Sequence, residues 1–374
     1  MLRIHMLPAA HGDCLLVEYG KANELYLILI DGGVYRTYND VLRAKLVAMP
    51  ETERRIELVV ITHVDADHIE GIIKLLADES LQIDIGDIWF NGYGHLTEDA
   101  PLNFGGVQGE CASALIEKRK IPWNKMTEGR SVHVPDQGPL PVFTLPGGMQ
   151  LTLLSPTREK MDAMADKWEV EVKKAGLVAG QSDDALEHWQ TKGKRKLLRF
   201  SDTPETPDVE DLVQSAYEGD GAAANGSSIA FLAEFDGKSV LFGADAHAEV
   251  LVASLERLLD ERKLSVLEVD AFKLPHHGSA ANLSPRLVEL VLPRQILVST
   301  SGAIFEHPDA EAIARSIARK RRVELVFNYR SEETTIWESK KLQEKYFYDV
   351  RYPEQDGQTM TVDVEENHAV LGST

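Results

Sequence analysis

The sequence has little cysteine and no long apolar run, and both absences narrow the class of protein. Among its 374 residues only Cys14 and Cys111 are cysteines. Two cysteines without CxxC spacing cannot build a disulfide framework, so we expect reduced thiols in a reducing compartment. No run of about 18 apolar residues occurs, and the start, "MLRIHMLPAAHGDC", lacks a basic leader and an apolar signal core. We therefore expect a cytoplasmic protein that does not bind a membrane.

Positive charge is also scarce. The chain has 40 Lys and Arg against 60 Asp and Glu, a formal net charge of −20. The resulting field repels a long phosphate backbone and disfavours tight, non-specific binding to nucleic acid. Two basic runs, residues 192–199 and 315–322, are typical of solvated helix faces, and the alternative is a basic track that guides a nucleic-acid strand.

The residues that are present favour one α/β domain. A hydrophobic fraction of 43% and a charged fraction of 27% are typical of a soluble globular protein. Short apolar strands bounded by Gly, Pro or Asn alternate with helical patterns, which favours layered α/β architecture. We expect a single domain over residues 1–374, with a helical, charged insertion at about 155–224 and a short C-terminal extension of strands and turns at about 329–374.

Polar side chains that bind metals follow the apolar strands. Residues 62–71, "THVDADHIEG", hold two histidines and two aspartates, and other strands are followed by similar residues. In layered α/β proteins, sites gather at the ends of strands. The residues collected in this way are Asp31, His63, Asp65, Asp67, His68, Asp245, His276 and His277.

The mixture of imidazole and carboxylate predicts a centre for two divalent metal ions. Two such ions about 4 Å apart can share a bridging hydroxide and stabilise the attacking and leaving oxygens of an in-line displacement, which suits phosphodiester hydrolysis. The simpler interpretation of the first motif is a helix start capped by Asp67. Capping explains one aspartate and not the two histidines that flank it.

The first motif, His63-x-Asp65-x-Asp67-His68, resembles the HxHxDH hallmark of the metallo-β-lactamase-fold hydrolases. Aspartate at position 65, together with further short motifs, is similar to the soluble domain of ComEC-type DNA-internalisation proteins. These motifs are "GDC" at 12–14, "NGSS" at 225–228, "LPHHGS" at 274–279 and "EHP" at 306–308. The resemblance covers about residues 1–328 and implies a four-layer αββα sandwich with the metals between two sheets.

The resemblance also implies a role for each residue. His63 and Asp65 would hold the first metal, Asp67, His68 and His276 the second, and Asp245 would bridge them. For one more ligand of the first metal the choice is His95, with His133 as its competitor. Asp67, His277 and His307 are the expected catalytic residues, the two histidines as groups that contact a phosphate or protonate the leaving oxygen.

Further expectations follow from general chemistry. Asp31 would accept the second ring N–H of a ligand histidine, and Ser279 would help to bind an oxyanion. Aspartate in place of histidine at position 65 makes the site harder, so we expect Mn²⁺ or Zn²⁺, with Mg²⁺ as a further candidate.

The predicted function is that of a metal-dependent hydrolase, a phosphodiesterase or nuclease acting on a single-stranded nucleic acid or a nucleotide. One alternative is hydrolysis of a small nucleotide, ester or lactam. The other is a binding or regulatory module that keeps the metal for stability.

Overall fold

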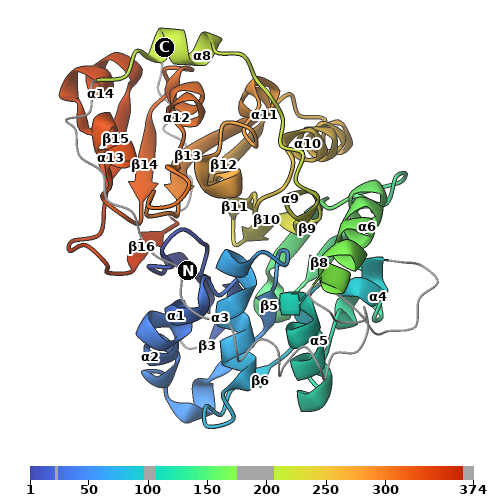
Figure 1. Ribbon diagram of the computed structural model, residues 1–374. Coiled ribbons are helices and arrows are strands. Elements are labelled where there is room, and N and C mark those ends of the chain that lie inside the picture. Colours follow the sequence, from blue (N-terminus) through green and yellow to red (C-terminus); the bar gives the residue numbers. More distant parts are fainter. Residues whose placement is uncertain (22–23, 97–106, 175–205, 365–374) are drawn as a thin grey trace.

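The computed structural model describes residues 1–21, 24–96, 107–174 and 206–364, and in them two sheets pack face to face (Figure 1). The first sheet has six strands in the order β16 (Met360–Asp363), β1 (Leu2–Met6), β2 (Leu15–Lys21), β3 (Glu24–Ile30), β5 (Leu58–Val60) and β7 (Ile88–Trp89). The second has eight, in the order β15 (Tyr348–Arg351), β14 (Val323–Phe327), β13 (Val291–Val298), β12 (Leu267–Lys273), β11 (Lys238–Phe242), β10 (Ala230–Phe235), β9 (Gln150–Ser155) and β8 (Val142–Thr144). A two-stranded pair, β4 (Arg55–Ile56) and β6 (Asp84–Ile85), lies apart from both.

Alternation along each strand of the six-stranded sheet divides its side chains between two cores. On β3, Ile28 and Ile30 belong to the core between the sheets, whereas Leu27 and Leu29 belong to the core under the helices. Successive side chains of a strand point to opposite faces. Because both faces are buried, these strands read as continuous apolar runs in the sequence.

Helices cover the outer faces of both sheets. The core on the outer side of the six-stranded sheet includes residues of α2 (Arg43–Val47), α3 (Ala66–Ala77), α5 (Val107–Arg119) and α6 (Arg158–Lys174). The helices α10 (Ala248–Arg262), α11 (Pro285–Leu290) and α14 (Lys340–Tyr346) pack on the eight-stranded sheet, and α12 (Ala310–Ile317) lies beside them (Figure 1). This four-layer αββα arrangement confirms the predicted fold class.

The C-terminal segment is part of both sheets. Strand β15 pairs with β14 in the eight-stranded sheet, and β16 pairs with β1 in the six-stranded sheet. Between β14 and β15 lie α13 (Glu332–Thr335), a short 3₁₀ turn (Ile336–Glu338) and α14. The segment that the sequence presents as an extension therefore connects the two sheets at one edge.

The predicted insertion begins with a packed helix. In α6 the side chains of Met161, Met164 and Trp168 are buried in the core under the six-stranded sheet. Farther along are the short helices α8 (Val209–Gln214) and α9 (Ala223–Gly226). The first basic run, residues 192–199, lies outside the described residues.

The second basic run, residues 315–322, is in part tied to the main chain. Arg315 is buried and donates to the carbonyl oxygens of Ala280 and Leu283. Arg319 donates to carbonyl oxygens at the C-terminal end of α11, including that of Val288. These two arginines are therefore occupied in holding α11 and α12 together. Among the described helices, none is long and apolar enough to cross a membrane.

Candidate metal centre

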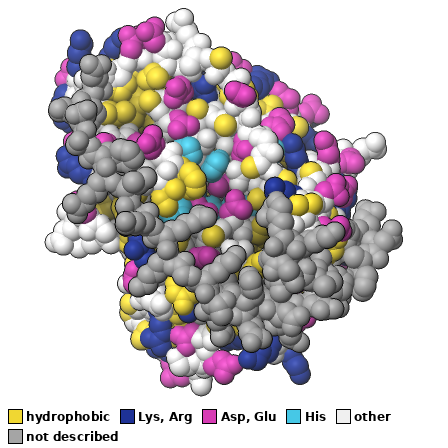
Figure 2. All heavy atoms as spheres, in the orientation of Figure 1, with side chains coloured by type: hydrophobic (Ala, Val, Ile, Leu, Met, Phe, Trp, Pro, Cys, Tyr) yellow, Lys and Arg dark blue, Asp and Glu magenta, His cyan; other side chains and the backbone are white. Residues whose placement is uncertain are grey.

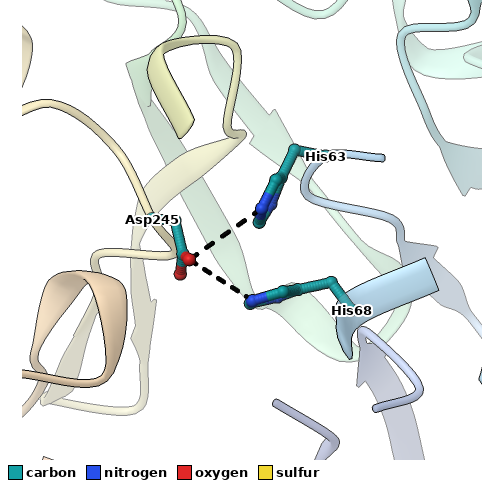
Figure 3. Close-up of side chains that lie close together, drawn as sticks. All are labelled: His63, His68 and Asp245. Atoms are coloured by element: carbon teal, nitrogen blue, oxygen red, sulfur yellow. Dashed lines mark ion pairs between the residues drawn. The ribbon is translucent and has the colours of Figure 1, made fainter. Parts of the chain in front are cut away.

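The candidate ligands follow neighbouring strands in the two sheets. Asp31 follows β3 and His63 comes soon after β5, which are parallel neighbours in the six-stranded sheet. Asp245 follows β11, and His277 follows β12, its parallel neighbour in the eight-stranded sheet. Because parallel neighbours end at the same edge, each sheet delivers its ligands to one place. Figure 3 shows His63 and His68 pointing at Asp245 from the opposite side.

The carboxylate of Asp245 lies at the centre of the cluster. Its Oδ2 atom is 3.9 Å from Nε2 of His63 and 3.4 Å from Nε2 of His68. The same atom is 3.8 Å from Nε2 of His276 and 3.8 Å from Nε2 of His277. Within the described residues, two groups have ligand atoms close enough to share an ion: His63, His68 and Asp245, and Asp67, His68 and His277.

Hydrogen bonds from the six-stranded side determine which nitrogen of His63 and His68 faces the centre. Nδ1 of His68 lies 2.7 Å from Oδ2 of Asp31 and donates to it, since a carboxylate only accepts. The Thr62 hydroxyl also donates to Asp31, at 2.7 Å. Its oxygen must therefore accept from Nδ1 of His63, 3.0 Å away. In the neutral form of both rings, which is the form that binds a metal, Nε2 is left to offer a lone pair.

The histidines from the eight-stranded side are held in the same way. Nδ1 of His277 donates to the Ser299 carbonyl oxygen at 2.9 Å. The amide nitrogen of Asn282 donates to the Asp245 carbonyl oxygen, so its side-chain oxygen accepts from Nδ1 of His276 at 2.8 Å. Four rings therefore present Nε2 to Asp245.

This arrangement fits a metal ion and is hard to explain without one. Nε2 of His63 and Oδ1 of Asp245 are buried and have no hydrogen-bond partner in the described part of the chain. Buried polar atoms are normally paired, because an unpaired one costs about 1–3 kcal/mol. A cation among the four Nε2 atoms and the carboxylates satisfies both atoms at once.

The electrostatic field of the site also favours a cation. Burial by itself would lower the pKa of His68, but the carboxylates of Asp245 and Asp31 outweigh it and raise that pKa well above its ordinary value. Burial would raise the pKa of Asp245, and the neighbouring histidines, His68 first, instead hold it well below its usual range. A field that stabilises a proton on His68 also stabilises a divalent ion.

A buried ion pair lies next to His277, on the side of the ring that carries Nδ1. Oδ2 of Asp13 is 2.7 Å from Nζ of Lys273, and these side chains are 3% and 1% exposed. The other carboxylate oxygen of Asp13 is 3.7 Å from Nδ1 of His277. Gly12 must be glycine, because a Cβ there would lie 1.7 Å from the Asp67 carbonyl oxygen. Sequence reasoning missed Lys273, although a lysine at the end of a buried strand signals a buried partner.

The structure places two predicted residues at the edge of the cluster. Oδ2 of Asp65 is 3.7 Å from Nε2 of His63, and its side chain is 49% exposed. Asp65 also occupies the N-cap position of α3 without a capping hydrogen bond from its side chain. Asp67 lies in the first turn of the same helix, with Oδ2 3.7 Å from Nε2 of His277.

His95 and His133 belong to neither group of candidate ligands found in the described ranges. His95, in α4 (Tyr93–Leu96), packs against Trp123 with ring centroids 4.7 Å apart. Burial lowers the pKa of His95 to about 4. His133 has Nδ1 3.0 Å from the Ser131 hydroxyl. Within the described ranges these contacts do not link either histidine to the candidate ligands, and a ligand role for His95 or His133 stays a prediction.

His277, rather than His276, groups with Asp67 and His68. Nε2 of His277 is 3.3 Å from Nε2 of His68, whereas the His276 side chain is 25% exposed. Both residues have positive φ angles, 45° and 56°. This left-handed turn directs the second ring inward, and a sequence with two adjacent histidines does not reveal which one that will be.

More rings surround the mouth of the site. The rings of His276 and His307 are 5.3 Å apart, and Nδ1 of His307 is 3.0 Å from Asp309. Phe305, 55% exposed, makes an edge contact with His11 at 5.7 Å. Histidine side chains reach the surface in the middle of this face, among hydrophobic and acidic side chains (Figure 2).

Ser279 is engaged inside its own turn. Its N–H donates to the His276 carbonyl oxygen at 2.8 Å, and its hydroxyl oxygen accepts from the N–H of Ala281 at 3.4 Å. Its backbone N–H is therefore not available to an oxyanion, whereas its hydroxyl can still donate, so the predicted oxyanion contact of Ser279 stays a prediction for that hydroxyl.

No family model and no curated protein matches the sequence. Solved structures with a similar course of the chain include zinc-bound PqqB from Methylobacterium extorquens, at 12% identity and a TM-score of 0.41, covering 96% of this chain and 99% of that one. YhfI from Bacillus subtilis, a metallo-β-lactamase-fold protein, has 10% identity and a TM-score of 0.38, with 96% and 99% covered. The short form of human tRNase Z has 11% identity and a TM-score of 0.38, with 98% and 100% covered. These values are too low to assign a substrate or a reaction.

Proposed function

We propose that this protein is a metal-dependent hydrolase with a centre for two divalent ions between its sheets. His63 and Asp65 would hold one ion and Asp67, His68 and His277 the other, with Asp245 shared between them. The observation that carries the proposal is the set of four Nε2 atoms around Oδ2 of Asp245. A purely structural metal site also uses about four protein ligands, so turnover, and not the number of ligands, separates a hydrolase from a binding module.

Bound divalent ions would supply an activated water and neutralise the charge that develops on the reacting group. The protein's own part is to hold the rings in place, through Asp31 and Thr62 on one side and Ser299 and Asn282 on the other. A partner on the second nitrogen of a ligand histidine fixes both its tautomer and its direction.

A proton donor for the leaving group stands at the mouth. Nδ1 of His307 is 3.0 Å from Oδ1 of Asp309, which orients the ring and leaves Nε2 to face outward. In its protonated form His307 can donate from Nε2 to a leaving oxygen. His276, the partly exposed member of the four, lies between His307 and Asp245 and is placed to contact the substrate.

A phosphodiester is the substrate class that suits this site best. Aspartates at 65, 67 and 245 make a carboxylate-rich centre, which favours Mn²⁺ or Mg²⁺ over a purely zinc-type site, although zinc still competes for the imidazoles. Phosphodiester hydrolysis needs in-line attack with both oxygens stabilised, which two ions provide. We therefore propose a phosphodiesterase that acts on a nucleotide or a single-stranded nucleic acid.

The test is turnover by the purified protein loaded with Mn²⁺, Mg²⁺ or Zn²⁺. Substrates are bis(p-nitrophenyl) phosphate, single-stranded DNA, RNA and a cyclic dinucleotide. We expect hydrolysis with at least one metal, and its loss below detection in Asp67→Ala and His277→Ala. His133→Ala, outside the cluster, is the matched control and should retain turnover. Stoichiometric metal without hydrolysis of any phosphodiester would overturn the phosphodiesterase and leave the binding module and the hydrolase of an ester or lactam as the alternatives.

A further inference from the structure

A surface pocket lies at the loop before β2, the loop that also approaches Asp67. It has a volume of about 230 Å³, and its lining includes Ala10, Arg36, Thr37, Asp40 and Tyr329. These residues come from the loop before β2, from the start of the helical segment after β3, and from the loop after β14. The pocket is therefore built by segments that are far apart in the sequence.

Three groups in this pocket can donate a hydrogen bond to a ligand. The Arg36 guanidinium is exposed and makes no ion pair with any described residue. Thr37 is buried, and its hydroxyl has no partner within the described ranges. The phenol oxygen of Tyr329 accepts the Ala10 N–H at 2.8 Å, so its own O–H can point elsewhere.

Donors without acceptors indicate an anion as the ligand. A buried hydroxyl without a partner is costly, and a bound acceptor removes that cost. Arginine presents a planar fork of N–H groups that matches the oxygens of a phosphate or carboxylate. Asp40 also lines the pocket, so binding depends on these directed hydrogen bonds more than on net charge.

The pocket and the metal centre share one loop. Ala10 lines the pocket, and two residues later Gly12 contacts the main chain of Asp67. Two residues span at most about 7 Å. His11, between them, packs its ring 5.7 Å from that of Phe305 at the mouth of the metal site.

We propose that this pocket binds a second phosphate group of the substrate, one that neighbours the phosphodiester undergoing hydrolysis. The inference rests on the proposed function and narrows its substrate class. Residues 10–12 reach from the pocket to the main chain of Asp67, so one substrate with linked phosphates can extend from the centre into the pocket. The preferred substrates are then oligonucleotides or phosphorylated dinucleotides, rather than molecules with one isolated phosphodiester.

Arg36→Met tests the proposal because it keeps the length of the side chain and removes the charge and the donors. Two substrates are compared: a 5′-phosphorylated dithymidylate, with two phosphates, and bis(p-nitrophenyl) phosphate, with one. We expect Arg36→Met to lower the ratio of kcat/KM for the first over the second by about 10- to 100-fold, mainly through KM, as the loss of charge-assisted hydrogen bonds implies. Thr37→Val should lower the ratio by about 2- to 10-fold. Arg130→Met, which removes a surface arginine paired with Glu128, is the control.

The outcomes separate this inference from the proposed function. An unchanged ratio in Arg36→Met, or an equal loss with both substrates, overturns the second-phosphate pocket and leaves the hydrolase proposal intact. If the wild-type protein hydrolyses neither substrate, calorimetric titration with the dithymidylate decides about the pocket alone. The proposed function fails only when single-stranded DNA, RNA and the cyclic dinucleotide are not hydrolysed either. Binding that weakens in Arg36→Met supports the pocket, and binding that does not change overturns it. If Arg36→Met weakens the binding of inorganic phosphate but not that of the dithymidylate, the pocket holds a free anion, which overturns the assignment to the substrate.

Discussion

Asp31 orients the metal centre through two of its histidines. It accepts hydrogen bonds from His68 and from Thr62, which in turn accepts from His63. We expect Asp31→Ala to weaken metal binding by about 10- to 100-fold, because ligand rings lose their fixed direction. Thr62→Val should weaken it less, since only His63 loses its partner.

Calorimetric titration of the metal-free protein with Mn²⁺ and Zn²⁺ measures the effect of Asp31→Ala. Circular dichroism shows whether the variant is folded. Equal affinity in a folded Asp31→Ala protein would contradict the orienting role.

Asp65 is the residue at which metal preference can be changed. Its side chain is half exposed and makes no capping hydrogen bond, so replacement should cost α3 little stability. Asp65→His adds a softer ligand next to His63, and we expect a higher ratio of bound Zn²⁺ to Mn²⁺. Elemental analysis after loading from an equimolar mixture measures this ratio. An unchanged ratio would mean that Asp65 does not contact a metal.

The sequence predicts well which residues lie near the candidate site, but it does not predict where their side chains point. Of the first motif, His63, Asp67 and His68 belong to the two groups of candidate ligands and Asp65 lies at their edge, because a strand end followed by a helix start leaves little freedom for residues 63–68. His276 and His277 differ only in how a left-handed turn directs them. His95 follows a strand just as the ligands do, yet its ring packs on Trp123.

Strand β12 ends in a buried lysine, and this position can be tested for stability. Lys273→Met leaves the Asp13 carboxylate buried without its ammonium partner. We expect a loss of about 3–5 kcal/mol in the free energy of unfolding, the usual cost of breaking a buried pair on one side. Adding Asp13→Asn should recover part of the loss, because the uncompensated charge is gone. Urea unfolding of the wild type, of Lys273→Met and of the double variant measures these free energies. A Lys273→Met protein as stable as the wild type would contradict the pairing.

His95 in helix α4 makes the free energy of unfolding depend on pH. Burial lowers the pKa of His95 to about 4 in the folded protein, from 6.5. His95 is thus neutral when folded, so its contribution is complete above pH 6.5 and is lost as the pH falls toward 4, because the unfolded chain binds the proton more readily. The loss is about 3 kcal/mol at most.

His95→Phe keeps a ring beside Trp123 and removes the titration. We expect a smaller decrease in the free energy of unfolding between pH 6.5 and 4 than in the wild type, measured by urea unfolding at several pH values. Metal content should be unchanged, because His95 has no contact with the candidate ligands found in the described residues. A fall in bound metal would restore His95 as a ligand.

At the scale of elements, the spacing of apolar residues along the sequence predicts which segments are strands and which are helices. Strands buried on both faces and helices with an apolar stripe have patterns that follow from geometry. The pairing of β15 and β16 with two different sheets does not, because pairing joins residues far apart in sequence, such as Met6 and Met360. For this reason the sequence predicts the C-terminal segment as an extension, whereas in the structure its strands belong to both sheets.

At the scale of the whole molecule, the candidate metal centre lies where the two sheets meet. His63 and His68 follow strands of the six-stranded sheet, and Asp245 follows a strand of the eight-stranded one (Figure 3). His277 also follows a strand of the eight-stranded sheet. Without a cation, buried carboxylates and unpartnered polar atoms face each other across the junction. Metal binding should therefore stabilise the packing of one half of the molecule on the other.

Removal of metal tests this last point. A ligand that binds only the folded protein adds about 2.7 kcal/mol at a free concentration 100 times its Kd. We expect the Tm to rise by several degrees when Mn²⁺ or Zn²⁺ is added to chelator-treated protein, and to fall again with excess chelator. Because bound metal would contact ligands from both sheets, His63→Ala and His277→Ala should each reduce this rise in Tm. His63 follows a strand of the six-stranded sheet and His277 a strand of the eight-stranded sheet. A gain that survives in both variants would mean that the metal binds elsewhere, and no gain at any concentration would mean that the junction holds without a cation.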